Sequence, residues 1–299
     1  MMVSGVRAGR AAVIIAFSML IFSAADLFAY SWPVDEPVVI STFGERRWGN
    51  YGRGIEVSGS SGEVHPSAAG ELVFYFEDDD AVSRMPSGLG SFAVVEHERK
   101  LRTLYGGLEL DESIGDKGPV GEDSLLGLAG QSGQTVDPHI YFAVIDSEFE
   151  QYVNPLLLLN SVIDNKKPVI RDVGLDTPAG YRSIGRNFVA KAGRTEIIAE
   201  IFDPCMSDEF FRPMSPYKIY LFHNGEEVFY LSFESIITAE NRSVVQSASE
   251  LHFGDFYKAD GRISLGEINL APGESRFEVL VSDYAGNESS RVFKIRVVE

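Results

Sequence analysis

The chain has 299 residues, 44% of them hydrophobic, so it is long and apolar enough to fold into two domains with packed cores. Its 44 acidic residues outnumber its 26 basic ones, and the net charge of -18 argues against nucleic acid as a partner. Cys205 is the only cysteine, which excludes an intramolecular disulfide and a multi-cysteine zinc site.

The first 29 residues have the layout of a secretory signal peptide. Arg7 and Arg10 precede an apolar run from Ala11 to Phe28, and small residues follow, ending with Ala29. A single amino-terminal membrane anchor is the alternative, although the uninterrupted apolar stretch is shorter than the ~20 residues that a span needs. Either way, we expect the rest of the chain to be exported to the periplasm or cell envelope, with no membrane contact beyond this segment.

Residues 30–164 are expected to form an antiparallel all-β domain. Short apolar runs alternate here with Gly, Pro, Ser and Asp, a pattern typical of strands joined by turns. The predicted strands are Val38–Ile40, Glu71–Phe76, Phe92–Glu96, Leu101–Tyr105 and Ile140–Ile145. A single short helix is predicted from Pro155 through Leu159, because proline suits the first helical position.

Residues 165–299 are expected to form a second all-β domain, a β-sandwich, after the polar linker Asn165–Pro168. Asn224-Gly225 separates two alternating runs and predicts a hairpin turn, because both residues readily take positive φ. The closing segment, Val281–Val292, resembles the last hairpin of bacterial immunoglobulin-like modules. That resemblance implies an immunoglobulin-like fold for this domain.

Several motifs between Trp32 and Leu159 follow one another in an order known from one protein family. They are Phe43–Arg46, Tyr51–Glu56, Val94–His97, Thr103–Leu108 and Pro138–Phe142. The sequence resembles the lysostaphin/LytM-type murein endopeptidases, whose motifs read Phe-Gly-x-Arg, His-x-Gly-Ile-Asp, Val-x-Ile-x-His, Thr-x-Tyr-x-His-Leu and Pro-His-Leu-His-Phe-Glu. The resemblance implies the LytM-like β fold, with its duplicated hybrid motif, and descent from zinc peptidases of the cell wall.

The residues that carry the family's chemistry have changed in this chain. The resemblance places Gly52, Glu56 and Tyr141 at the zinc-ligand positions, and Gly107 and His139 at the positions of the catalytic histidines. A catalytic zinc needs about three protein ligands and an open position for water. Glycine has no donor and tyrosine is a neutral phenol with a pKa near 10. We therefore expect no bound metal and no catalytic residues, with Glu56 and His139 as vestiges.

A rearranged zinc site is the alternative. Glu56, His65 and His139 could supply three ligands, which would make the protein a zinc-dependent murein endopeptidase with zinc as its cofactor. Without such a rearrangement, His65 is expected on a surface turn and His97 as a hydrogen-bonded strand residue. A protein that only assembles the envelope is a third possibility.

The cleft of the family can persist without its metal, because binding and chemistry depend on different residues. We predict that five residues line it as a ligand-binding surface: Arg46, Tyr51, Tyr105, His139 and Tyr141. Ordinary strand packing is the alternative for the tyrosines. The resemblance implies peptidoglycan or a murein hydrolase as partner, since degenerate family members activate such enzymes. The predicted function is that of an exported, catalytically inactive LytM-like protein in peptidoglycan metabolism.

Overall fold

The computed structural model describes residues 30–78, 88–109, 117–132, 138–205, 212–247 and 250–299. The expected signal segment, residues 1–29, lies outside this range. None of the helices in the described residues is long and apolar enough to cross a membrane. Strands make up 58% of the structure and helices 4%, which confirms the predicted all-β class.

The first part of the chain forms most of a large sheet. Its elements are β1 (Val38–Ser41), β2 (Arg46–Arg47), β3 (Asn50–Tyr51), β4 (Ile55–Ser58), β5 (Glu63–Val64), β6 (Gly70–Phe76), β7 (Ser91–Glu96), η1 (Glu98–Lys100), β8 (Leu101–Glu109), β9 (Gly118–Val120), β10 (Gly127–Ala129), β11 (Ile140–Asp146), β12 (Gln151–Val153) and η2 (Pro155–Leu157). The helix predicted at Pro155 is a short 3-10 turn, whose first turn Asn154 caps by accepting from the Leu156 amide.

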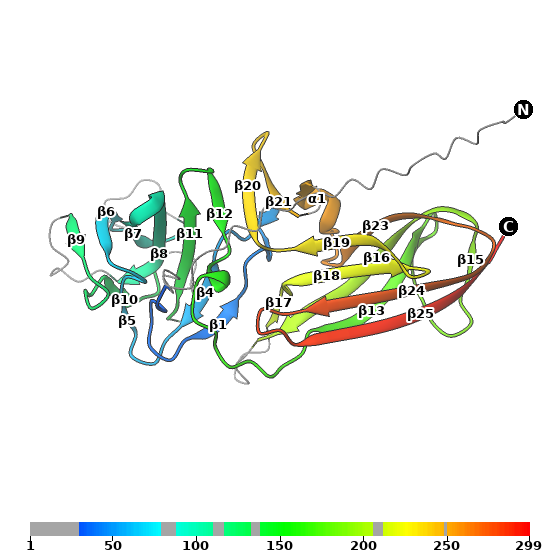
Figure 1. The fold of residues 1–299 in the computed structure, drawn as a ribbon, viewed down its shortest axis with the longest axis horizontal. Helices are drawn as coiled ribbons and strands as arrows, with labels where there is room; N and C mark the ends of the chain where they lie inside the picture. The colour runs from blue at the N-terminus through cyan, green and yellow to red at the C-terminus, as the bar shows by residue number, and fades with distance from the viewer. Residues whose placement is uncertain (1–29, 79–87, 110–116, 133–137, 206–211, 248–249) are drawn as a thin grey trace, which may run out of the picture.

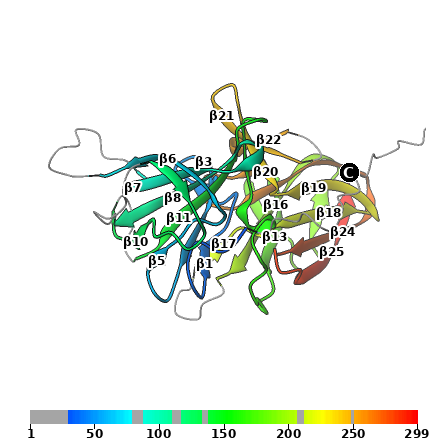
Figure 2. The same cartoon turned by 60° about the vertical axis from the view of Figure 1, so that its left-hand side comes forward.

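The second part forms two five-stranded sheets and a three-strand extension of the first sheet. Its elements are β13 (Val169–Thr177), β14 (Gly180–Ser183), β15 (Val189–Lys191), β16 (Gly193–Pro204), β17 (Pro213–Met214), β18 (Lys218–His223), β19 (Glu226–Ser232), β20 (Ser235–Ala239), β21 (Arg242–Gln246), β22 (Glu250–His252), α1 (Phe253–Phe256), β23 (Ile263–Leu270), β24 (Gly273–Ser282) and β25 (Glu288–Val298). Figures 1 and 2 show β13 and β16 of one five-stranded sheet lying alongside β18, β24 and β25 of the other.

The two parts share one sheet. Its strand order is β22-β21-β20-β12-β11-β8-β7-β6-β9, so three strands from beyond residue 234 continue a sheet that begins in the first part. Figure 1 shows β20 and β21 standing beside β12, and Tyr152 of β12 lies opposite Ile236 of β20. This pairing covers an edge of β12 that would otherwise offer unpaired backbone groups to solvent.

An aromatic cluster completes the junction between the two parts. Tyr51 packs edge-on against Phe233 and Phe253, with ring centroids 6.2 and 5.4 Å away. Gly44 has φ +85°, and a Cβ there would lie 2.2 Å from the Phe233 ring, so only glycine fits. The Tyr257 hydroxyl donates to the Gly44 carbonyl at 3.0 Å. The loop Phe43–Arg46 is therefore held by residues of the second part.

Candidate functional site

Strand pairing brings three of the five family positions together. Glu56 of β4 lies directly opposite Tyr141 of β11, so their side chains share one face of the sheet. His139 precedes Tyr141 by two residues and so is placed on the same face. Its Nε2 lies 3.8 Å from the Glu56 Oε1, and each residue is less than one-tenth exposed.

Two guanidinium groups occupy the Glu56 carboxylate. Arg47 of β2 places Nη2 2.6 Å from Oε1, and Arg212 of the second part donates from Nη1 to Oε2 at 3.0 Å. Arg47 also donates to the Ser41 hydroxyl at 2.9 Å. The carboxylate that corresponds to a zinc ligand is thus engaged on both oxygens by arginine.

These contacts keep Glu56 ionised. Burial acts to raise the pKa of its carboxyl, but the opposing effects of His139, Arg47 and Arg212 are larger together, and the pKa falls from 4.5 to about 2. A charged, arginine-bound carboxylate at neutral pH has little capacity left for a further cation.

Arg47 also lies beside Gly52, the residue that the resemblance assigns to a zinc-ligand position. A Cβ on Gly52 would lie 3.4 Å from the Glu45 carbonyl oxygen and 3.5 Å from the Arg47 Cγ, both ordinary contacts, so a small side chain fits beside the arginine. The arginine stem thus runs beside the place where the family has a histidine, and its charged end reaches Glu56.

The position that the resemblance assigns to a catalytic histidine, Gly107, has an unusual backbone. Gly107 has φ +77° and lies where the register of β7 and β8 shifts, between the pairs Ser91–Leu108 and Phe92–Gly106. Such a bulge with positive φ favours glycine and would strain a histidine.

Tyr141 packs against the backbone instead of presenting a metal donor. A Cβ on Gly54 would lie 2.7 Å from the Tyr141 ring and 2.5 Å from the Phe142 carbonyl, so the ring rests on the glycine. Burial raises the pKa of the Tyr141 phenol well above its ordinary value, which keeps it neutral.

Two of the residues predicted to line a ligand cleft, Tyr51 and Tyr105, are buried in the core instead. Tyr51 is 2% exposed within the aromatic cluster, and Tyr105 is fully buried, where its hydroxyl accepts from the Ser67 amide and the Thr103 hydroxyl, both at 2.8 Å. Arg46 is exposed, but its Nη1 donates to the carbonyls of Lys258 and Ala259. Packing between strands and between the two parts of the chain explains the corrections.

The donor set does not fit a family-type zinc site. Glu56 alone offers an anionic ligand, Gly52 offers none, and the Tyr141 phenol is neutral on a half-buried side chain. His65 does not complete a rearranged site: its Nδ1 lies 3.0 Å from the Ser124 carbonyl, and no group of three metal-binding side chains around Glu56 is present among the described residues. His97 is hydrogen-bonded as expected, with Nε2 2.7 Å from the Thr103 hydroxyl, but it lies directly after β7 and before η1, not on a strand.

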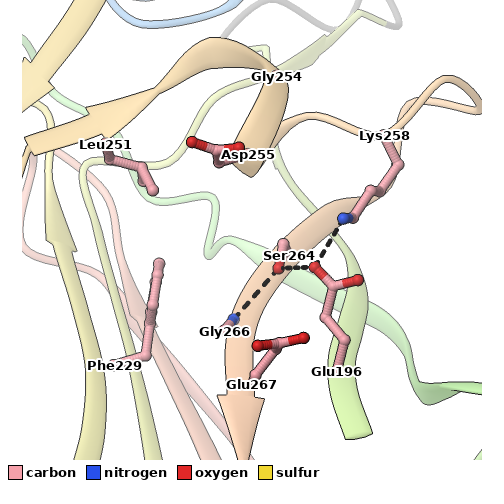
Figure 3. A pocket seen from close by; sticks show the side chains of 9 residues that line it. All are labelled: Glu196, Phe229, Leu251, Gly254, Asp255, Lys258, Ser264, Gly266 and Glu267. Atoms are coloured by element: carbon pink, nitrogen blue, oxygen red, sulfur yellow. Dashed lines mark hydrogen bonds and ion pairs between the residues drawn. The ribbon is translucent and has the colours of Figure 1, made fainter.

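A separate pocket of about 320 Å³ lies in the second part of the chain (Figure 3). Most of its charged groups are already partnered with one another or with neighbours. Lys258 pairs with Glu196 at 2.6 Å, Ser264 donates to the same carboxylate, and Glu267 pairs with Arg194 outside the pocket. These three contacts form a structural ion-pair cluster, and the Asp255 carboxylate lines the pocket beside it.

Sequence reasoning missed the arginines of the site. Arg47 directly follows the Phe-Gly-x-Arg motif, so its place on the two-residue strand β2, opposite Asn50, could have been inferred from the Trp48-Gly49 turn. Arg212 had no signal, because it comes from a segment 156 residues away from Glu56.

The comparisons with known proteins show similarity at the level of the fold only. A family model without a functional description matches residues 167–298. No curated protein matches the sequence. Similar solved structures include a zinc-containing peptidase from Vibrio cholerae, at 22% identity and a TM-score of 0.35, over 45% of this chain and 40% of the peptidase.

Two further structures are similar over different lengths. The SpoIIQ–SpoIIIAH pore-forming complex matches at 24% identity and a TM-score of 0.35, over 45% of this chain and 92% of the matched chain. Lysostaphin from Staphylococcus simulans matches at 12% identity and a TM-score of 0.32, over 80% of this chain and 91% of its own. This chain spans less than half the length of the Vibrio cholerae peptidase.

Proposed function

We propose that this protein is an exported, non-catalytic LytM-like protein that binds peptidoglycan in the cell envelope. In this proposal residues 1–29 are the signal peptide, residues 30–164 the degenerate peptidase-like domain, and residues 165–299 an immunoglobulin-like β-sandwich. The hairpin strands β20–β22 then serve as the sandwich's extension into the first sheet.

The observation that carries the proposal is the pairing of Glu56 with Arg47 and Arg212. Hydrolysis by the family mechanism needs a metal that lowers the pKa of the attacking water. Here the remaining metal-type ligand is neutralised by fixed positive charge, and Gly107 brings no general acid or base. The ordered motifs of residues 32–159 support the LytM-like assignment, while the site supports loss of its chemistry.

The same residues support binding of carboxylates. Arg212 and Arg47 have side chains that are 46% and 26% exposed, so they can add contacts to a ligand without leaving Glu56. Arg53, whose guanidinium carbon lies 5.0 Å from the centre of the Tyr152 ring, lies in the connection between β3 and β4. Guanidinium groups bind carboxylates in bidentate geometry, and the peptides of peptidoglycan carry free carboxylates.

Incubation with purified murein sacculi tests the catalytic half. We expect no release of new peptide ends from sacculi, with or without added zinc, because no metal-activated water forms at Glu56. Release of peptide ends that requires zinc and disappears in His139→Ala would overturn this half of the proposal.

Co-sedimentation with the same sacculi tests the binding half. The unmodified protein should pellet with sacculi, and Arg212→Gln should lower the bound fraction several-fold, on the order of 1 kcal/mol for one exposed charged contact. Arg194→Gln, at an exposed arginine of β16, is the matched control and should bind normally. Equal binding by both variants would show that the Glu56 region is not the binding surface. Binding to a purified murein hydrolase but not to sacculi would replace peptidoglycan with a protein partner.

A further inference from the structure

Three aspartates from separate parts of the chain meet where the linker joins the second part. Asp164 directly precedes the linker Asn165–Pro168, Asp203 lies near the end of β16, and Asp283 directly follows β24. One carboxylate oxygen of each lies within 4.8 Å of the other two. Figure 1 shows the β24–β25 turn at the end of the second part that faces the first part, next to the linker. It is the one such group of three His, Cys, Asp or Glu side chains among the residues that the structure describes.

The charges of this group are not balanced by protein. Asp203 and Asp283 are each 2% exposed, and the Asp203 Oδ1 is buried with no hydrogen-bond partner. The ion pairs of the described residues involve other carboxylates, and the Lys166 ammonium in this region donates to the Cys205 carbonyl at 3.1 Å. Burying a carboxylate without a partner is costly, so the site as it stands lacks a positive charge.

Electrostatics agrees with this geometry. Burial, reinforced by the charges of Asp283 and Asp164, raises the pKa of Asp203 to about 8. A bound cation would offset the repulsion among the three carboxylates and so lower the pKa of Asp203.

Neighbouring groups hold the other two aspartates in place. The Asn287 amide donates to the Asp283 Oδ1 at 2.8 Å, and the Asn287 Nδ2 donates to the Asp283 Oδ2 at 2.9 Å and to the Asp164 carbonyl at 3.0 Å. The Lys166 amide donates to the Asp164 Oδ1 at 2.8 Å. Each carboxylate oxygen can accept more than one bond, so these contacts orient the aspartates and leave lone pairs for a ligand.

We propose that Asp164, Asp203 and Asp283 bind one Ca²⁺ ion, which fastens the linker to the second part of the chain. The donor set consists of oxygens alone, which suits a hard cation and not zinc or copper. Two oxygens bound to one Ca²⁺ at about 2.4 Å are at most about 4.8 Å apart, in agreement with the spread of the three aspartates. Mg²⁺ binds at about 2.0–2.1 Å in a strict octahedron and would require a tighter group.

Calcium titration of the purified protein, after treatment with a chelator, tests the proposal. We expect one Ca²⁺ per chain by calorimetry and a saturable rise in melting temperature, with an affinity in the range of extracellular calcium modules, about 10⁻⁴–10⁻³ M. The same titration with Mg²⁺ should give a response at least about tenfold weaker. The proposal would be overturned if about 10 mM Ca²⁺ gave neither a heat of binding nor a rise in melting temperature. It would also be overturned if Mg²⁺ gave the same heat and the same rise as Ca²⁺.

Variants separate a bound ion from a general effect of salt. Asp203→Asn keeps the shape of the side chain and removes a ligand charge, so it should abolish the rise caused by Ca²⁺ while leaving the calcium-free protein as stable as before or more stable. Asp164→Asn, at the partly exposed position before the linker, should weaken Ca²⁺ binding at least about tenfold and decides the question if Asp203→Asn does not fold. Asp176→Asn, at an exposed aspartate of β13, is the matched control and should respond like the unmodified protein. A response to Ca²⁺ that persists in Asp164→Asn would contradict the assignment.

Discussion

Replacing Arg47 by methionine is expected to destabilise the protein by about 2–3 kcal/mol at pH 7, because it leaves the buried Glu56 carboxylate with a single arginine. Methionine keeps most of the apolar stem of arginine, so the lower free energy of unfolding reflects the lost charge and not lost packing. Arg212→Met is the matched comparison. Its side chain is 46% exposed, so its removal should cost less than about 1 kcal/mol. Urea unfolding of the two variants measures both values.

The pH dependence of this difference has a definite sign. The Glu56 pKa is about 2 in the folded protein and 4.5 ordinarily, so the pairing contributes its full stability above about pH 4.5. That contribution is lost as the pH falls from about 4.5 toward 2, because the unfolded chain takes up the proton first. The gap between the unmodified protein and Arg47→Met should therefore narrow from pH 5 to pH 3. An equal cost for both arginine variants, or a gap that is constant with pH, would contradict the assigned pairing.

Restoring the family's ligands should create a zinc site only if the arginine is also removed. The variant Gly52→His, Glu56→Asp, Tyr141→His supplies the three ligands, but Arg47 lies 3.5 Å from the new side chain's Cβ position and its guanidinium occupies the carboxylate. Adding Arg47→Ser removes both effects of Arg47 and leaves Arg212, which contacts the other carboxylate oxygen from a half-exposed side chain. We expect the fourfold variant to bind zinc on the order of 100-fold more tightly than the threefold variant, as measured by calorimetric titration.

The threefold variant is the control in that experiment. If it binds zinc as tightly as the fourfold variant, Arg47 does not block the metal position. Hydrolysis of sacculi should remain absent in both, since the bulge at Gly107, with φ +77°, still lacks a histidine.

Local sequence patterns predicted much of the fold. The alternating runs identified the strands that became β1, β6, β7, β8 and β11, and Asn224-Gly225 forms the β18–β19 hairpin with φ of 51° and 90°. The strand period also placed His139 and Tyr141 on one face, where the structure brings them to Glu56.

Features that depend on distant contacts were not predictable in the same way. The pairing of β20 with β12 joins residues more than 80 positions apart, and no periodicity in either strand encodes the partner. The local sequence around Tyr51 and Tyr105 is compatible with either a cleft or a core position. Their burial follows from distant contacts, with Phe233 for Tyr51 and with Ser67 for Tyr105. The approach of Arg212 to Glu56, and of Asp164 to Asp203, likewise follows from the tertiary fold alone.

Zinc analysis of the purified, unmodified protein is the most direct test of a site in which arginine takes the place of the metal. After equilibration with zinc and removal of the excess, we expect well under one zinc per chain, and a titration should show no site tighter than micromolar, since Glu56 is bound to Arg47 and Arg212. One zinc per chain, held with sub-micromolar affinity and lost in Glu56→Ala, would contradict it.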